Sequence, residues 1–185
     1  MREREVRFKI NEKIRNEIIN SSKLVEDKSK YVDLCFGQYG FASLDILGYI
    51  IRLRNKNGKC VLESKKRISD TEWQEVCLPI ENMKKGAEFL SNLSLKPYLY
   101  INRTREVRKI NEAKVFIDDV ELLGTFVEFE FEDSFSLEDI KYYLEKVGIF
   151  SLPEKLYGDI FKESINNPEF KNKFYKSLND FLMKN

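Results

Sequence analysis

The sequence predicts an α+β fold, with an antiparallel sheet of eight or nine strands and flanking helices. Segments with period-two alternation recur between residues 3 and 131, and most are joined by short polar turns. Helical spacing dominates from about residue 136. Short turns join antiparallel neighbours, because parallel strands need a long crossover. The pattern fits either a sandwich or a closed barrel, and we expect residues 1–185 to form one domain with C-terminal helices.

The first half of the chain opens with an amphipathic strand, "EREVRFKI", at residues 3–10. A helix over 11–24 is expected to begin at Asn11, a residue type that caps helix N-termini. A strand at 30–36 precedes a glycine-containing segment at 37–45 that reads as a loop. Two strands in "YIIRLRNKNGKCVLESKK" flank an Asn-Gly dipeptide, which is a strong hairpin signal.

The second half continues with strands and ends in helices. Met83, Phe89, Leu90 and Leu93 predict an amphipathic helix over 82–93. Phenylalanines at helical spacing near the C-terminus predict a packed face, either core or a dimer contact. The remaining strands are expected at 72–80, 97–108, 113–118 and 124–131, and the helices from about 136 onward.

Composition limits the function. The chain has 32 basic and 31 acidic residues and a net charge of +1, so it has no global attraction for nucleic acid or anionic membrane. It has no histidine, which excludes His-based triads and imidazole metal sites. The N-terminus is charged, so no signal peptide is expected. The longest apolar run, "ILGYII", is too short to span a bilayer. Cys35, Cys60 and Cys77 show no CxxC spacing, so we expect free core thiols in a cytoplasmic protein.

Nearly every predicted strand has one apolar and one ionic face. Taken singly, such a face is usually the solvated side of a sheet. Here, however, the middle strands carry the arginines, whereas the first and last strands carry glutamates. The positions that share a strand face are Arg52 and Arg54, Glu63 and Lys65, Arg103 and Arg105, and Glu128 and Glu130, with Asp118 ending another strand.

Like charges at i and i+2 repel one another unless something neutralises them. A divalent cation neutralises carboxylates, and a chain of phosphates neutralises arginines. A metal–polyphosphate complex does both at once. The charge pattern therefore indicates a triphosphate held between an acidic wall and a basic wall.

These residues also carry a family resemblance. The sequence resembles the CYTH superfamily, named for class IV adenylate cyclase and thiamine triphosphatase and also called triphosphate tunnel metalloenzymes. Six motifs match in order between residues 3 and about 161. They are an ExExK-like strand in "EREVRFKI", a basic hairpin in "IRLRNKNGKCVLESK", Glu75 in "EWQEV", a basic strand in "INRTREV", the acidic signature "IDDVELLGTFVEFE", and a C-terminal helix with Tyr157 in "LYGDIF".

The resemblance implies an antiparallel β-barrel, the triphosphate tunnel, that binds Mg²⁺ or Mn²⁺ and a small-molecule triphosphate. Glu75 would orient the basic side chains. The implied metal ligands are Glu3, Glu5, Asp118, Glu128 and Glu130, and the implied phosphate ligands are Arg52, Arg54, Lys65, Arg103 and Arg105.

Some positions depart from the family pattern. Arg7 stands where the family usually has lysine, and arginine does not release its proton near neutral pH. Lys9 lies on the same strand face and is the expected substitute, so the implied catalytic set is Glu3, Glu5, Arg7 and Lys9. Cys35 replaces an expected tyrosine, and Arg103 replaces an expected lysine.

The expected function is metal-dependent hydrolysis of inorganic triphosphate, thiamine triphosphate or a nucleoside triphosphate. The first alternative is a class IV adenylate cyclase that converts ATP to cAMP. The second is a domain that binds polyphosphate or a nucleotide without catalysis. The shared motifs recognise the triphosphate rather than the group attached to it. No nucleic-acid or membrane partner is expected, and a homodimer is kept as a hypothesis.

Overall fold

The structure is a computed structural model that describes residues 2–38, 41–42, 48–69, 72–131, 137–150 and 157–184. Its strands are β1 (Arg2–Lys9), β2 (Lys23–Gln38), β3 (Phe41–Ala42), β4 (Tyr49–Lys56), β5 (Lys59–Arg67), β6 (Glu72–Ile80), β7 (Lys96–Ile110), β8 (Ala113–Val120) and β9 (Gly124–Phe131). Its helices are α1 (Glu12–Ser21), α3 (Met83–Asn92), α4 (Leu137–Lys146), α5 (Tyr157–Ser164) and α6 (Pro168–Lys184).

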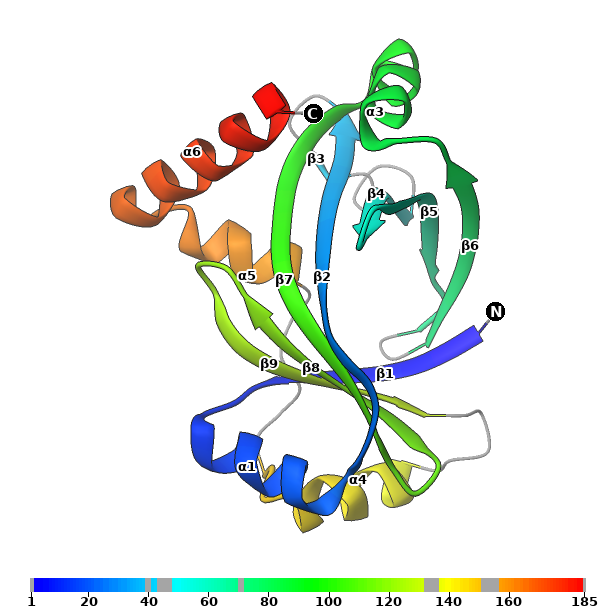
Figure 1. Ribbon diagram of the computed structural model, residues 1–185, viewed down its shortest axis with the longest axis vertical. Coiled ribbons are helices and arrows are strands. Elements are labelled where there is room, and N and C mark those ends of the chain that lie inside the picture. Colours follow the sequence, from blue (N-terminus) through cyan, green and yellow to red (C-terminus); the bar gives the residue numbers. More distant parts are fainter. Residues whose placement is uncertain are drawn as a thin grey trace.

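Eight of these strands close into an antiparallel barrel. The order is β2-β4-β5-β6-β1-β9-β8-β7, and β7 pairs back with β2, while β3 adds only to the end of β2. The long, curved strands β2 and β7 cross the whole molecule side by side (Figure 1). The shortest seam joins β1 to β6 through Arg2–Arg4 and residues 72–74. The structure thus confirms the α+β class and selects the barrel over the sandwich.

Helices cover the outside of the barrel. Helices α1 and α4 lie at one end of the molecule and α3 at the other, with α5 and α6 along one side (Figure 1). Phe8, Ile18, Val127 and Phe129 belong to one apolar cluster and are almost fully buried. A second cluster combines strand residues with Phe161 and Phe174 of α5 and α6, along with residues of α3. The C-terminal phenylalanines therefore pack in the core, which was one of the two predicted alternatives, the other being a dimer contact.

Two local predictions are confirmed in detail. The side chain of Asn11 caps α1 by accepting a hydrogen bond from the Ile14 backbone N–H at 3.0 Å. The β4–β5 hairpin turns at Asn57 and Gly58, which both have positive φ, as a tight hairpin turn requires.

Other predictions were wrong. Strand β2 begins at Lys23 rather than residue 30, because register shifts between Leu24 and Ser29 break the period-two pattern. It also extends to Gln38, and β3 follows, so part of the predicted loop at 37–45 is strand; residues 39–40 and 43–45 of it lie outside the described ranges.

Some expected core positions are exposed. Cys77 is an exposed thiol, whereas Cys35 and Cys60 are buried as expected. The side chains of Phe89 in α3 and of Leu93, directly after the helix, are more than half exposed, although both were placed on the apolar face. The close contact of α3 with the barrel is made instead at Gly86, where a Cβ atom would lie 2.7 Å from Leu53 Cδ2.

Candidate functional site

The barrel interior holds a charged cavity of about 190 Å³. One water occupies roughly 10–15 Å³ on this measure, so the cavity has room for a short chain of phosphates. We call this cavity the tunnel. It is lined by Glu5, Arg7, Arg52, Arg54, Lys65, Glu75, Arg103, Arg105, Phe116, Glu128, Glu130 and Tyr157.

Strand alternation and register bring these charges together. Side chains two residues apart on a strand share a face, so most of the ionic side chains predicted to share strand faces point into the barrel. Across β1 and β9, Glu5 stands opposite Glu130 and Arg7 opposite Glu128. Arg52 likewise stands opposite Glu63 on the neighbouring strand. Two of these three pairs therefore place a cation opposite a carboxylate, whereas Glu5 and Glu130 are a like-charge pair.

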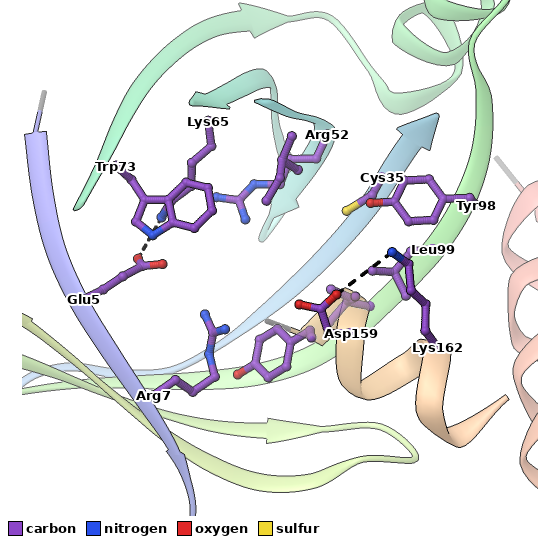
Figure 2. A pocket seen from close by; sticks show the side chains of 14 residues that line it. Glu5, Arg7, Cys35, Arg52, Lys65, Trp73, Tyr98, Leu99, Asp159 and Lys162 are labelled. Atoms are coloured by element: carbon purple, nitrogen blue, oxygen red, sulfur yellow. Dashed lines mark hydrogen bonds and ion pairs between the residues drawn. The ribbon is translucent and has the colours of Figure 1, made fainter. Parts of the chain in front are cut away.

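Among the described side chains, each of the six cations that line the tunnel contacts a carboxylate. Arg7 donates a hydrogen bond to Glu128, and Lys65 bridges Glu5 at 2.7 Å and Glu75 at 3.0 Å (Figure 2 draws the Lys65–Glu5 pair). The other pairs join Arg52 to Glu63 and Glu75, Arg54 to Asp33 and Glu63, Arg103 to Asp33 and Asp118, and Arg105 to Asp118 and Glu128.

This network corrects the picture of separate acidic and basic walls. The strands do carry blocks of like charge, but neighbouring strands interleave them, so the protein neutralises its own tunnel. Like charges on a strand were expected to need an external counterion. The register supplies that counterion from the next strand instead. A bound anion would therefore have to share the tunnel cations with these carboxylates or displace the carboxylates from them.

Two buried aspartates hold the basic side chains in place. Asp33 is fully buried and accepts from Arg54 Nε at 2.7 Å and from Arg54 Nη2 at 3.1 Å, and it lies 3.0 Å from Arg103 Nη1. Asp118 accepts two hydrogen bonds of 2.7 Å from Arg105. Burial alone would raise the pKa of Asp33, but the Arg103 and Arg54 guanidinium groups outweigh it and hold that pKa well below its ordinary value. The pKa of Asp118 is lowered in the same way, mainly by Arg105.

Two titratable groups of the tunnel, the Lys65 amine and the Tyr157 hydroxyl, have raised pKa values. Burial would lower the pKa of Lys65, but the charges of Glu5 and Glu75 raise it above its ordinary value. Burial raises the pKa of Tyr157 far above its ordinary value, and its hydroxyl donates to Asp118 at 2.9 Å. The guanidinium of Arg7 lies 4.1 Å from the Tyr157 ring centroid, a cation–π distance. The side chains of Lys65 and Tyr157 thus stay protonated near neutral pH.

Acid is expected to destabilise this interior. Asp33, Glu75, Asp118 and Glu128 all have pKa values lowered by neighbouring cations against the opposing effect of burial. A lowered folded-state pKa stabilises the fold fully above the unfolded value, about 4, and that stabilisation is lost as pH falls through the folded value. The free energy of unfolding should therefore stay nearly constant from pH 7 to 5 and fall steeply below pH 4. Urea unfolding between pH 7 and 3 measures this, and an unchanged value at pH 3 would contradict it.

The tunnel collects most, but not all, of the predicted site residues. All five predicted phosphate ligands line it, as do Glu5, Arg7, Glu128 and Glu130. Asp118 lies behind the lining, with both carboxylate oxygens bonded to Arg105 and one also to Tyr157. Lys9 is exposed at the end of β1, with its Nζ 5.9 Å from the Phe126 ring centroid, and does not line the tunnel. Glu3 is in β1 opposite Trp73, but its side chain lies outside the described set.

The carboxylates at one side of the tunnel fit a hard divalent cation in chemistry. Glu5 and Glu130 face one another across β1 and β9, where like charges repel. Each has a lysine partner: Lys65 pairs with Glu5, and Lys114 Nζ lies 2.5 Å from Glu130 Oε1. The side chain of Lys114 is half exposed. Within the described part of the chain, no three carboxylates converge as a ready-made metal site. A metal ion at Glu5 and Glu130 would replace these lysine contacts, whereas the predicted ligands Asp118 and Glu128 are already paired with arginines.

Sequence reasoning missed two members of the network. Asp33 received no role, although it is the one acidic residue in the apolar segment "YVDLCF". An isolated carboxylate in a buried strand is costly unless a cation pairs with it, and that was the available signal. Glu63 was recognised only as the strand neighbour of Lys65. Its contacts with Arg52 and Arg54 depend on the β4–β5 register.

Comparisons with known proteins agree with this geometry. The family model described as "CYTH domain" matches residues 1–147. A conserved hypothetical protein of Pyrococcus furiosus is 25% identical with a TM-score of 0.72, and the alignment covers 84% of this chain and 97% of that one. No curated protein sequence matches the chain. In the described residues, no helix combines the length and apolar character needed to cross a membrane.

Two more distant structures share the fold. A protein of Vibrio parahaemolyticus, named as a candidate adenylate cyclase, is 15% identical with a TM-score of 0.65 and covers 86% of this chain and 97% of its own. A Hippeastrum protein described as having a dominant triphosphatase activity is 18% identical with a TM-score of 0.62, covering 88% of this chain and 95% of its own.

Proposed function

The chain belongs to the CYTH domain family, and on that basis we propose that it is a metal-dependent enzyme that hydrolyses a triphosphate in its tunnel. The observation that carries the proposal is the convergence of six cationic side chains on one cavity with carboxylates beside them. These cations come from four different strands, β1, β4, β5 and β7, and they line the interior of the barrel rather than a patch on its surface. The similarity to the Hippeastrum protein with triphosphatase activity supports hydrolysis over other reactions.

The cationic side chains would hold the phosphates. Arginine binds phosphate oxygens through planar, paired N–H donors, and Arg52, Arg54, Arg103 and Arg105 are all anchored by carboxylates that set their direction. Lys65 stays protonated between Glu5 and Glu75 and adds a further positive charge. Negative charge on the leaving phosphate is stabilised by such preorganised donors, which is the main requirement of phosphoryl transfer.

The acidic side chains would hold the metal. Glu5 and Glu130, with Glu128 beside them, are the proposed ligands, and Glu3 is proposed from its place on the same strand. When bound, Mg²⁺ or Mn²⁺ would supply positive charge against the phosphates and would activate an attacking water. Arg7 is fixed by Glu128 and would orient substrate as a permanent cation, since arginine does not act as a base. A catalytic role for Lys9 stays a proposal, and its side chain is exposed and does not line the tunnel.

Cyclisation of ATP is the second candidate, and the likeness to the Vibrio parahaemolyticus protein favours it. The two reactions use the same tunnel and differ in the attacking oxygen. Water is always present, whereas cyclisation needs the ribose 3′-oxygen held in line with the α-phosphorus. Hydrolysis therefore makes the smaller demand on this site.

A substrate panel tests the proposal. Inorganic triphosphate, thiamine triphosphate and ATP are each incubated with Mg²⁺ or Mn²⁺, and both phosphate and cAMP are measured. We expect metal-dependent phosphate release that EDTA abolishes, with little or no cAMP. Release of cAMP without phosphate would assign the cyclase reaction instead. Tight binding of a triphosphate without any turnover would identify a binding domain.

A further inference from the structure

A cavity of about 560 Å³ lies outside the barrel, between the barrel wall and α6. Helix α6 runs beside the long strand β7 at this side of the molecule (Figure 1). We call the cavity the outer groove, with a floor of Val32, Asn55 and Asn102 and a wall of Ser177, Asp180 and Phe181 on α6. Small-molecule sites commonly have volumes of about 300–1,000 Å³, so the groove has room for a ligand of nucleoside size.

The floor of the outer groove is the reverse side of the tunnel wall. Val32 of β2 pairs with Asn55 of β4 and with Asn102 of β7, so the three residues form one row across the strands. Successive side chains on a strand point to opposite faces of the sheet. The residues that follow or precede this row in the chain therefore belong to the tunnel network, namely Asp33, Arg54 and Arg103. The sheet itself separates the two sites.

The charges of the outer groove differ from those of the tunnel. Among the described residues that line it, the carboxylates of Glu121 and Asp180 stand against a single lysine, Lys30. A phosphate group would be repelled by these two carboxylates, whereas an uncharged molecule would not. The groove is therefore unsuited to the phosphorylated molecules that the tunnel is proposed to hold.

The polar groups of the outer groove offer both donors and acceptors. The Oδ1 of Asn55 accepts from the Gly58 backbone N–H at 2.8 Å, which leaves the N–H donors of that amide for another partner. The Nδ2 of Asn102 donates to Glu121 at 2.7 Å, which leaves its carbonyl oxygen as an acceptor. Asp180 adds a carboxylate, an acceptor only. The edge of a nucleobase carries donors and acceptors side by side and matches such a set.

One end of the outer groove is aromatic. The ring centroids of Tyr100 and Phe181 lie 5.0 Å apart with their planes at 36°, and both side chains are partly buried. Burial, with the charge of Glu121 adding to it, raises the pKa of Tyr100 to about 12, so the hydroxyl stays uncharged near neutral pH. Nucleobases gain free energy by stacking on aromatic side chains, whereas a sugar has no flat ring to offer. The aromatic end therefore favours a molecule that carries a base.

We propose that the outer groove binds an uncharged nucleoside whose base carries an exocyclic amino group. The base lies against Tyr100 and Phe181, its amino group donates to Asp180, and the ribose hydroxyls reach the amides of Asn55 and Asn102. An amino group is required because a carboxylate only accepts hydrogen bonds. This site goes beyond the proposed triphosphate chemistry and does not depend on it.

Calorimetric titration with matched nucleosides tests the proposal. Adenosine and inosine differ in an amino group against a carbonyl oxygen, and so do cytidine and uridine. We expect the amino-bearing member of each pair to bind at least about fivefold more tightly, because it alone donates to the carboxylate. AMP should bind more weakly than adenosine, since its phosphate meets the carboxylates of the groove.

Three variants of α6 locate the bound nucleoside. Asp180→Ala should reduce the ratio of adenosine to inosine affinity to near one. Phe181→Leu keeps an apolar side chain but removes the ring, and it should weaken the binding of every nucleoside at least about fivefold. Asn179→Ala changes the neighbouring exposed position outside the groove lining and should leave both quantities unchanged. Thermal unfolding shows whether each variant keeps its fold, and Asp180→Ala, at an exposed position, carries the test if Phe181→Leu does not fold.

Four results would overturn the nucleoside site. They are no binding of any nucleoside at millimolar concentration, affinities that Asp180→Ala and Phe181→Leu both leave unchanged, tighter binding of AMP than of adenosine, and binding of ribose alone as tight as that of adenosine. The last result would assign the groove to sugars instead. None of the four bears on triphosphate hydrolysis, which the substrate panel tests separately.

Discussion

Replacing Asp33 with alanine is expected to lower the free energy of unfolding by about 3–5 kcal/mol, because removal of one partner leaves buried charges unpaired. Asp33 has no exposed surface and contacts both Arg54 and Arg103, each of which is largely buried. For a chain of this length, each kcal/mol shifts the melting temperature by about 2–4 °C. Thermal unfolding should therefore show a melting temperature lower by about 6–20 °C. Urea unfolding measures the loss of free energy directly.

A surface ion pair provides the matched control. Glu169 contacts Lys173 at 2.6 Å on α6, but both side chains are more than half exposed. Such pairs contribute only about 0–1 kcal/mol, so Glu169→Ala should change little. Asp33→Asn keeps the shape and an acceptor oxygen but removes the charge, and it should fall between the two. If Asp33→Ala proved no more harmful than Glu169→Ala, Asp33 could not be the anchor of these arginines.

Replacing Glu130 with glutamine is expected to reduce metal-dependent turnover at least about 100-fold while leaving the fold intact. The carboxylate lines the tunnel opposite Glu5 and is bonded to the half-exposed Lys114. Loss of that pair costs the fold little, about 1 kcal/mol or less. Phosphate release is measured over a range of Mg²⁺ and Mn²⁺ concentrations, and the half-saturating concentration should rise.

Lys114→Ala separates the carboxylate from the ion pair. It removes the cationic partner of Glu130 but keeps the proposed metal ligand, so metal-dependent turnover should persist. Equal loss of activity in both variants would indicate that the ion pair, rather than metal binding, is what matters. Glu128 is less suitable for this test, because Glu128→Ala would also remove the carboxylate paired with Arg7 and one of the two carboxylates paired with Arg105.

Most of the barrel could be predicted because its signals are local. Alternation marks the strands, Asn57-Gly58 marks a hairpin, and Asn11 caps the first helix. Each of these depends on neighbouring residues and survives any tertiary arrangement. Strand β2 shows where that reasoning fails, since its register shifts hide seven strand residues that only pairing with β7 reveals.

The candidate site was predictable in its residues but not in its pairings. All five predicted phosphate ligands line the tunnel, as their places on strand faces indicated. The partner of each cation, however, is set by strand register across the barrel, as Arg7 opposite Glu128 shows. Lys9 illustrates the opposite case. It shares the strand face of Arg7, but the strand ends there and its side chain is exposed.

The sequence by itself determined which side chains share a strand face, since that follows from the two-residue repeat of an extended chain. It thereby determined an ionic interior and, through its motifs, the family. Only the tertiary structure decided that opposite charges interleave, that Asp33 and Glu63 belong to the network, and that a second cavity with both aliphatic and charged walls lies between the tunnel and α5. The physical reason is that these contacts join strands and helices far apart in the chain, and their register is set by barrel closure and packing rather than by local sequence.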